Sequence, residues 1–341
     1  VPFLKIQFFA AGQGTSPAPF FTIQGGKFMN APAGAIRKKR HPFLQSLVKQ
    51  REMWLLCVPI IVWVAVFCYY PMYGLLMAFV DYVPGREIWE CDFVGLKYFA
   101  RFITGNDFPR LLRNTLAMSG LSLTVGFVCP ILFAFMLNEL GNLKIKKFVQ
   151  TASYLPHFIS WVVAGAMVTQ LLATDGVLND LLLATGLIDE PISYLQKGEW
   201  YWGLYTVINI WKGLGWSTII YLSAMSGVDE ELYQAGVIDG LGRLGLARHI
   251  TLPTLIPTIV LLWIMNVGNI LSAGFDQHLI IGNTITQRYW DVIDTYSYRY
   301  GVQQGYYSMG TAVSFMKALV GFVLVLVTNF IARRASDVAL F

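Results

Sequence analysis

Residues 229–257 read DEELYQAGVIDGLGRLGLARHITLPTLIP. Asp229 and the two glutamates after it predict the start of a helix, because acidic side chains cap free backbone N–H groups and suit the positive end of the helix dipole. The next positions follow a helical i, i+3, i+4, i+7 spacing and are mostly small, namely Leu232, Ala235, Gly236, Asp239 and Gly240. The stretch predicts a helix over 230–246 whose small face lets another protein surface approach closely. A plain connecting loop with turn-forming glycines explains the same residues and stays an alternative.

Long apolar runs surround this stretch. The 341-residue chain is 55% hydrophobic and 13% charged, whereas a soluble domain carries about 25% charged residues. A run of about 20 apolar residues spans a bilayer as a helix. Six runs are long enough: 54–80, 114–137, 148–172, 201–225, 255–275 and 309–332. The sequence therefore predicts an all-α polytopic membrane protein with six transmembrane helices.

Basic residues gather beside alternate ends of these runs. They precede the first run and follow the second, fourth and sixth, and cytoplasmic loops of membrane proteins carry such an excess of Lys and Arg. Both termini and the 226–254 loop are therefore expected in the cytoplasm. Residues 1–50 are expected to form a flexible basic segment, and residues 51–341 the transmembrane domain.

Two segments are expected on the opposite side. Residues 174–200 contain apolar stretches between Gly and Pro and are expected to hold a short interfacial helix. Residues 276–308 are rich in Tyr and Gln, which is typical either of an ordinary wet loop or of a surface that contacts an external protein or a sugar.

The opening stretch resembles the EAA loop of ABC importer permeases, in which EAA and then DG are followed by Ile-x-Leu-Pro and a second Pro. The matching positions, without insertion or deletion, are Ala235, Asp239, Gly240, Ile250, Leu252, Pro253 and Pro257. The resemblance implies the type I ABC importer permease fold, with a cytoplasmic coupling helix that sits in a cleft of the nucleotide-binding subunit. The residues implied in this coupling loop are Glu231, Gln234, Ala235, Gly236, Asp239, Gly240 and Pro253.

The stretch departs from the family pattern at four positions. Gln234 stands where the family usually has Glu, and Gly236 replaces the second alanine. Leu241 and Ala247 replace a further alanine and an aromatic residue. Gln234 can form hydrogen bonds but no ion pair, so the docking contact is expected to depend chiefly on shape.

Further stretches resemble one branch of these permeases, which imports oligosaccharides from polysaccharide breakdown. They are the segments 93–97, 114–116, 137–140, 154–161, 215–216 and 294–296 and the position Asn329. The resemblance implies the bacterial inner membrane, an oligosaccharide substrate, a second homologous permease, two ATP-binding cassette subunits and an extracytoplasmic solute-binding protein. It leaves open whether the cargo is neutral or acidic, such as uronate-containing fragments of the alginate type.

The chain has no ATP site of its own. A Walker phosphate-binding loop needs Gly-Lys followed by Ser or Thr, and no lysine here precedes either residue. ATP and magnesium are therefore expected in partner ATPase subunits, and this chain is expected to be a transport subunit rather than an enzyme. No basic soluble module points to nucleic acid, and no cysteine–histidine cluster points to a metal.

An ion-coupled secondary sugar transporter is the main alternative. Such carriers usually need intramembrane acids or broken helices, and the six apolar runs contain no central Asp or Glu. An intramembrane enzyme would need a motif such as HExxH or GxSxG, and neither is present.

Polar and aromatic residues inside the last three runs are candidates for the substrate pathway. They are Asn209, Trp211, Lys212, Trp216, Asn266, Asn269 and Lys317. Charges inside a membrane are expensive, so the two lysines are expected to face a cavity or a partner. Lipid-interface anchoring explains the tryptophans equally well, and hydrogen bonding between helices explains the asparagines.

Overall fold

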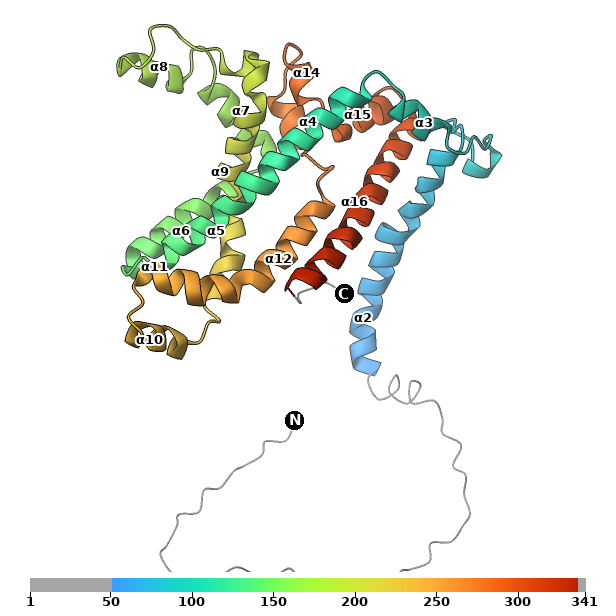
Figure 1. Ribbon diagram of the computed structural model, residues 1–341. Coiled ribbons are helices and arrows are strands. Elements are labelled where there is room, and N and C mark those ends of the chain that lie inside the picture. Colours follow the sequence, from blue (N-terminus) through green and yellow to red (C-terminus); the bar gives the residue numbers. More distant parts are fainter. Residues whose placement is uncertain (1–50, 337–341) are drawn as a thin grey trace, which may run out of the picture. The chain divides into compact units, whose positions relative to one another are not determined.

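The computed structural model describes residues 51–336, and the regular secondary structure in that range is helical, apart from one isolated bridge between Val80 and Phe93 (Figure 1). The α-helices are α2 (Arg51–Val64), α3 (Lys97–Ile103), α4 (Phe108–Leu121), α5 (Phe127–Asn138), α6 (Leu143–Phe158), α7 (Trp161–Leu171), α8 (Val177–Ala184), α9 (Tyr201–Met225), α10 (Glu230–Ile238), α11 (Arg243–Leu246), α12 (Leu252–Gly268), α13 (Asp276–Ile281), α14 (Gln287–Trp290), α15 (Ile293–Tyr298) and α16 (Tyr307–Ser336). Short π- and 3₁₀-helical segments are η1 (Ala65–Tyr69), η2 (Tyr70–Phe79), η3 (Ile88–Glu90), η4 (Ser122–Gly126), η5 (Tyr194–Gln196), η6 (Gly198–Trp200), η7 (Ala247–Thr251) and η8 (Arg299–Gln303). The described residues fall into two units, one within Val1–Val62 and the other within Trp63–Phe341. The predicted basic segment 1–50 lies outside the described residues.

Four helical stretches are long and apolar enough to cross a membrane. They are Glu52–Phe79, Phe108–Asn138, Arg243–Gly268 and Tyr307–Arg334. Each contains most of a predicted run, but the run 255–275 extends too far, because α12 ends at Gly268. The predicted run 201–225 coincides with α9, whose 25 residues measure about 37 Å along the helix axis.

The predicted run 148–172 is not one helix. α6 ends at Phe158 and α7 begins at Trp161, with Ile159 and Ser160 in extended conformation between them. The Ser160 hydroxyl accepts a hydrogen bond from the Val163 backbone N–H at 3.3 Å, which caps the new helix. Expecting one helix here was wrong because the apolar pattern continues unchanged across the break.

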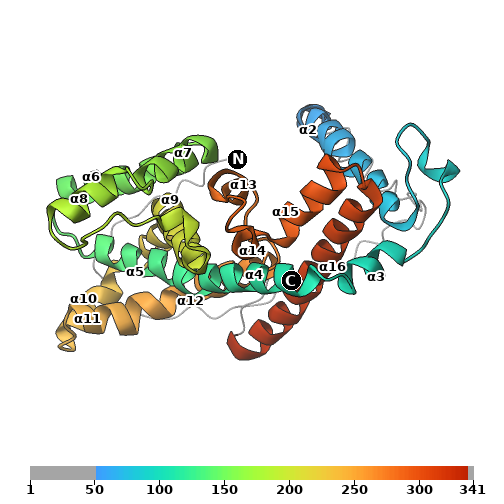
Figure 2. The ribbon, with the colours of Figure 1, turned by 90° about the horizontal axis from the view of Figure 1, so that it is seen from above.

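Helices of the unit Trp63–Phe341 pack in close pairs. α5 and α6 both lie along α9, and α12 lies along α16 (Figures 1 and 2). Glycines set two of these contacts. A Cβ atom at Gly215 of α9 would lie 2.3 Å from the Ser153 carbonyl oxygen of α6, and one at Gly268 of α12 would lie 2.3 Å from Val325 of α16. The missing side chains therefore permit close helix contact.

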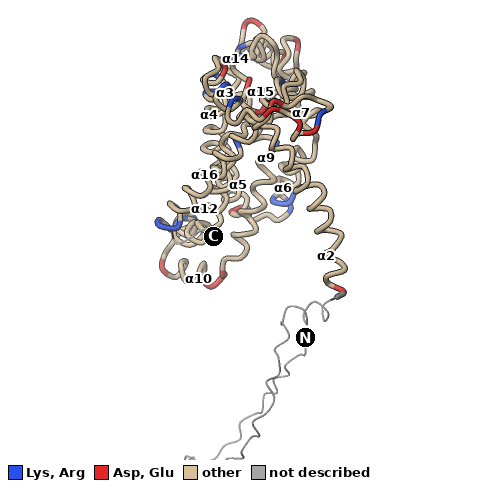
Figure 3. The backbone as a smooth tube through the Cα atoms, turned by 90° about the vertical axis from the view of Figure 1, so that its right-hand side faces the viewer, with Lys and Arg blue, Asp and Glu red and all other residues tan. Residues whose placement is uncertain are grey.

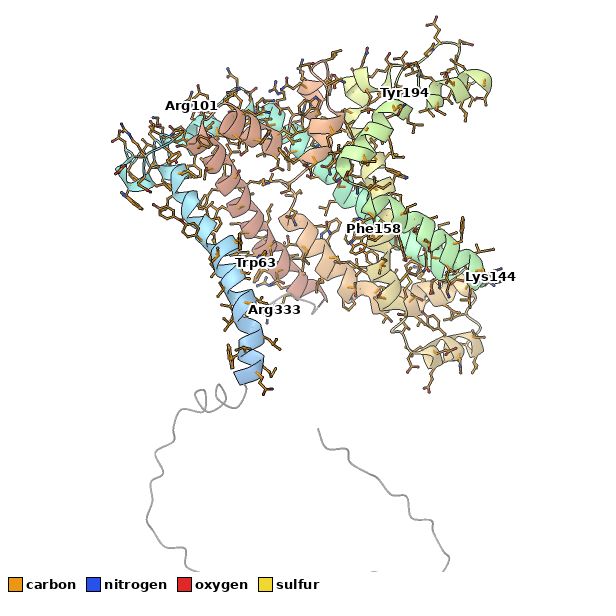
Figure 4. All side chains as sticks on the ribbon, turned by 180° about the vertical axis from the view of Figure 1, so that it is seen from behind. Trp63, Arg101, Lys144, Phe158, Tyr194 and Arg333 are labelled. Carbon is orange, nitrogen blue, oxygen red and sulfur yellow. The ribbon has the colours of Figure 1, made fainter. Side chains whose placement is uncertain are left out.

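Charged residues gather toward the two ends of these helices (Figure 3). Arg101 and Tyr194 lie at one end, and Lys144 and Arg333 lie at the other (Figure 4). Lys144, near the start of α6, and Arg333, near the end of α16, therefore lie at the same end of the structure.

The segment from α13 to η8 is a folded cap rather than a wet loop. Its side chains Trp290, Val292, Ile293 and Tyr296 are buried, and so is the polar side chain of His278. The segment 174–200 contains one short α-helix, α8; its expected place at the membrane interface stays a prediction.

Candidate functional site

The predicted cytoplasmic helix begins where the sequence indicates. The Asp229 side chain accepts a hydrogen bond from the Glu231 backbone N–H at 3.0 Å and caps α10. α10 ends at Ile238, earlier than the predicted 230–246, because Gly240 adopts a φ of +82°. The Leu241 N–H donates to the Gly236 carbonyl at 2.9 Å and closes this left-handed turn. α11 then starts a separate helix.

Gly236 lets α10 pack closely against α11 and η7 of the same chain. The residue is buried, and a Cβ atom there would lie 2.7 Å from Leu246 and 2.8 Å from Ile250. The hydroxyl groups of Tyr233 and Thr251 lie 2.8 Å apart, which adds a hydrogen bond from α10 to η7. The glycine that departs from the family alanine therefore serves an internal contact, and α10 is attached to the segment that continues into α12.

Around this internal contact, α10, the turn after it and α11 carry exposed apolar side chains, here together called the α10 surface. Its most exposed members are Ile238 and Leu244, at 86% and 85% exposure. It also contains Leu232 and Val237, and the predicted coupling residues Glu231, Gln234, Ala235, Asp239 and Gly240 are exposed around it. Pro253 is exposed in the first turn of α12. Several exposed apolar side chains on one short segment are typical of an interaction site.

Two of the pathway candidates meet at the break between α6 and α7. The Lys212 ammonium group donates to the His157 carbonyl at 2.9 Å and lies 5.1 Å from the Trp161 ring. The Trp216 ring stacks on the His157 imidazole with the ring centres 4.5 Å apart. Carbonyl groups at the end of a helix lack partners within it, so Lys212, which is only 8% exposed, caps α6.

The remaining candidates lie in three other places. The Gln277 side chain donates to Asn209 at 3.4 Å and links α9 to α13. Trp211 and Asn266 are exposed, and the amide of Asn266 donates to a carbonyl of its own helix. Asn269 and Lys317 line one cavity of about 420 Å³ between α12 and α16.

Lys317 has an acidic partner that sequence reasoning missed. Its ammonium group forms an ion pair with the Asp294 carboxylate of α15, and both side chains are about one-fifth exposed. Asp294 lies in the cap and outside every apolar run, so a search of those runs for acids could not find it. The signal available was its place in the segment 294–296, which matches the family branch.

Another matching segment, 114–116, contacts the same part of the cap. The Asn114 side-chain amide donates to the carbonyls of Arg288 and Asp291, both at 2.9 Å. The Thr115 hydroxyl accepts from the Ile293 N–H at 3.2 Å. Residues 114–115 of α4 and residues 288–293 of the cap, far apart in the sequence, are thus joined by one set of hydrogen bonds, here called the polar latch.

A buried carboxylate completes this latch. Asp291 is fully buried, and its side chain receives Arg299 at 2.5 Å and the Thr295 hydroxyl at 2.7 Å. Arg110 of α4 lies 3.5 Å from the same carboxylate and 2.7 Å from Asp107. Two cations and two anions therefore balance at this end of the structure.

Known proteins are similar to this chain in sequence and fold. A family model described as "Binding-protein-dependent transport system inner membrane component" matches residues 126–337. The chain belongs to this family. The permease family that residues 229–257 predict is thereby confirmed, and this family member is a membrane transport subunit.

Two relatives from Bacillus subtilis (strain 168) match nearly the whole of this permease. Protein LplB is 38% identical over 300 residues, covering 88% of this chain and 94% of LplB. The polygalacturonan/rhamnogalacturonan transport system permease protein YteP is 40% identical over 302 residues, with the same coverage.

Solved structures agree with these relatives. A chain of a bacterial ABC transporter involved in the import of the acidic polysaccharide alginate superposes with a TM-score of 0.79 at 36% identity, covering 86% of this permease and 99% of that chain. A second structure, of the bacterial alginate ABC transporter in complex with an alginate pentasaccharide-bound periplasmic protein, matches with the same TM-score and identity.

Proposed function

We propose that this permease forms part of the pathway of an ATP-driven oligosaccharide importer. The motion of the partner ATPase subunits is transmitted to it through α10. The observation that carries the proposal is the two-sided character of α10. One side packs on its own chain through Gly236 and Tyr233, and the other side carries the exposed Gln234 and Ile238 as part of the α10 surface.

The proposed mechanism is alternating access driven from a partner ATPase dimer. Closure of that dimer displaces α10, and the contacts at Gly236 carry the motion into η7 and α12. The close contact between Gly268 and Gly321 then passes it to α16. A set of packed helices with two arrangements can switch the pathway between inward- and outward-facing states.

The proposed membrane topology has six crossings with both termini in the cytoplasm. Besides the four long apolar stretches, α9 and the broken pair α6–α7 supply the remaining two. A crossing helix that is broken is tolerated where neighbours satisfy its free backbone groups, and Lys212 does so for the His157 carbonyl. The proposed partners are a second permease, two ATPase subunits that bind ATP and magnesium, and an extracytoplasmic solute-binding protein.

The proposed cargo is an acidic oligosaccharide. The relatives named above include permeases for polygalacturonan/rhamnogalacturonan and for alginate, which is itself described as an acidic polysaccharide. Lys212 and Lys317 place two cationic groups in helices of the proposed pathway. Neutral oligosaccharides are the alternative cargo, and an ion-coupled sugar transporter is the alternative mechanism.

Reconstitution of the complete complex in liposomes tests the proposal. Trigalacturonate and maltotriose are compared as acidic and neutral probes, with ATP hydrolysis and sugar uptake as readouts. We expect ATP-dependent uptake of the acidic probe that persists when ionophores collapse all ion gradients. Uptake that continues without ATP and stops with ionophores would establish the ion-coupled alternative.

A further inference from the structure

The ion pair between Lys317 and Asp294 joins two helices that meet at the cap. Asp294 belongs to α15 and Lys317 to α16. Lys317 lies ten residues after the start of α16 at Tyr307, which corresponds to about 15 Å along the helix. That length is about half the thickness of the bilayer hydrocarbon. In the proposed topology the pair therefore connects the outer cap with the middle of the membrane.

Each member of the pair lines a different cavity. Asp294 lines a cavity of about 380 Å³ between α15 and α16, together with the aromatic rings of Phe275, Tyr298 and Tyr307. Lys317 lines the cavity of about 420 Å³ between α12 and α16, together with Asn269 and Ser272. The ion pair therefore joins the linings of an aromatic outer cavity and of an inner cavity whose polar side chains are Lys317, Asn269 and Ser272.

The outer cavity has the chemistry of a sugar subsite. Aromatic rings offer flat apolar faces, and three residues with hydroxyl groups, Ser297, Thr311 and Ser314, line the same space. Ligand sites typically combine predominantly apolar walls with a few placed polar groups. A sugar that enters this cavity reaches the Asp294 side of the ion pair first.

An acidic sugar can exchange with Asp294 without leaving Lys317 unpaired. A lysine inside a membrane needs an anionic or carbonyl partner, because a lone charge there is expensive. A sugar carboxylate supplies that partner in the same charge-assisted form that Asp294 does. A neutral sugar supplies none, so it would have to break the pair and leave the ammonium group without compensation.

We infer that the Lys317–Asp294 pair is a gate between the outer and inner cavities, opened when a carboxylate of the transported sugar replaces Asp294 as the partner of Lys317. The inference rests on the proposed transport of acidic oligosaccharides and deepens it, because it assigns the choice between acidic and neutral cargo to one residue pair. It also gives Asp294, which lies outside the apolar runs, a role in specificity.

Thiol labelling of the inner cavity in the assembled complex tests the gate. The four native cysteines are replaced, and a single cysteine is placed at Ser272 in the inner cavity or, as a matched control, at Ser314 in the outer cavity. A membrane-impermeant charged thiol reagent is added from the outside of liposomes, without ATP. We expect slow labelling at Ser272→Cys that trigalacturonate accelerates at least fivefold and maltotriose leaves unchanged, with fast labelling at Ser314→Cys throughout.

Charge variants separate a gate from a merely structural pair. With Lys317→Gln, labelling at Ser272→Cys should be fast and independent of either sugar. The double exchange Lys317→Asp with Asp294→Lys restores an ion pair, so labelling should again be slow. The exposed lysine in Lys197→Gln is the matched control and should behave as the unmodified complex does.

The outcomes distinguish the gate from the proposed function. If trigalacturonate stimulates ATP hydrolysis but leaves Ser272→Cys labelling unchanged, the gate inference is wrong and the transport proposal stands. If neither sugar stimulates ATP hydrolysis in the complete complex, the transport proposal itself fails. Equal acceleration by maltotriose would also overturn the gate, because it removes the role of the carboxylate.

Discussion

Replacing Asp291 by Asn should loosen the cap more than any exposed charge replacement. The substitution keeps the shape and one acceptor oxygen but removes the negative charge that balances Arg299 and Arg110. Breaking a buried ion pair on one side costs about 3–5 kcal/mol. Because the two arginines are 23% and 34% exposed, solvent screening reduces that cost, and we expect roughly 2–4 kcal/mol.

The control is Asp81→Asn, which removes a surface carboxylate. Asp81 lies 3.2 Å from Lys97, and both side chains are about half exposed, so this pair should contribute less than about 1 kcal/mol. The assay heats the detergent-solubilised protein and measures the fraction that stays monodisperse on size-exclusion chromatography. At roughly 2–4 °C for each kcal/mol, Asp291→Asn should lower the midpoint by about 5–15 °C. A midpoint equal to that of Asp81→Asn would show that the Asp291 carboxylate does not stabilise the cap.

Two further predictions concern the interior. Burial lowers the pKa of His278 to about 4, from an ordinary value of 6.5, so the unfolded chain binds the extra proton between these values. The free energy of unfolding should therefore be at its full value above pH 6.5 and fall by roughly 3 kcal/mol as the pH drops toward 4. His278→Gln should remove this fall, so the melting temperature should depend less on pH in that range. A Cβ atom at Gly215 would meet backbone atoms of Ser153, whereas one at Gly213 has open space, so Gly215→Ala should lower the melting midpoint and Gly213→Ala should not; equal midpoints would contradict the close packing of α9 on α6.

Periodicity and local capping predict much of the helical structure. The apolar runs located most of the long helices, because burial in lipid requires continuous apolar segments regardless of tertiary detail. The start of α10 followed from Asp229, since capping is a local interaction. The family itself followed from the joint spacing of Asp239, Gly240, Pro253 and Pro257.

The features that the sequence did not predict depend on contacts between distant segments. Gly236 looked like part of a face for a partner, but Leu246 and Ile250 lie against it, and helical spacing cannot tell an inner small face from an outer one. The break at Ile159 leaves the apolar pattern intact, so the run 148–172 looked continuous. Asp291 and Asp294 lie in a segment without periodicity, and their partners Arg110 and Lys317 come from other helices.

Crosslinking from the α10 surface to the ATPase tests the central claim most directly. A single cysteine at Ile238, in a background without the native cysteines, is treated with a short bifunctional thiol reagent in the complete, active complex. The matched control is a cysteine at Leu187, which is 71% exposed in the segment proposed to face outward. The account predicts a crosslink from Ile238→Cys to an ATPase subunit and none from Leu187→Cys. A fully assembled complex in which Ile238→Cys and Leu244→Cys both fail to crosslink would contradict coupling through α10.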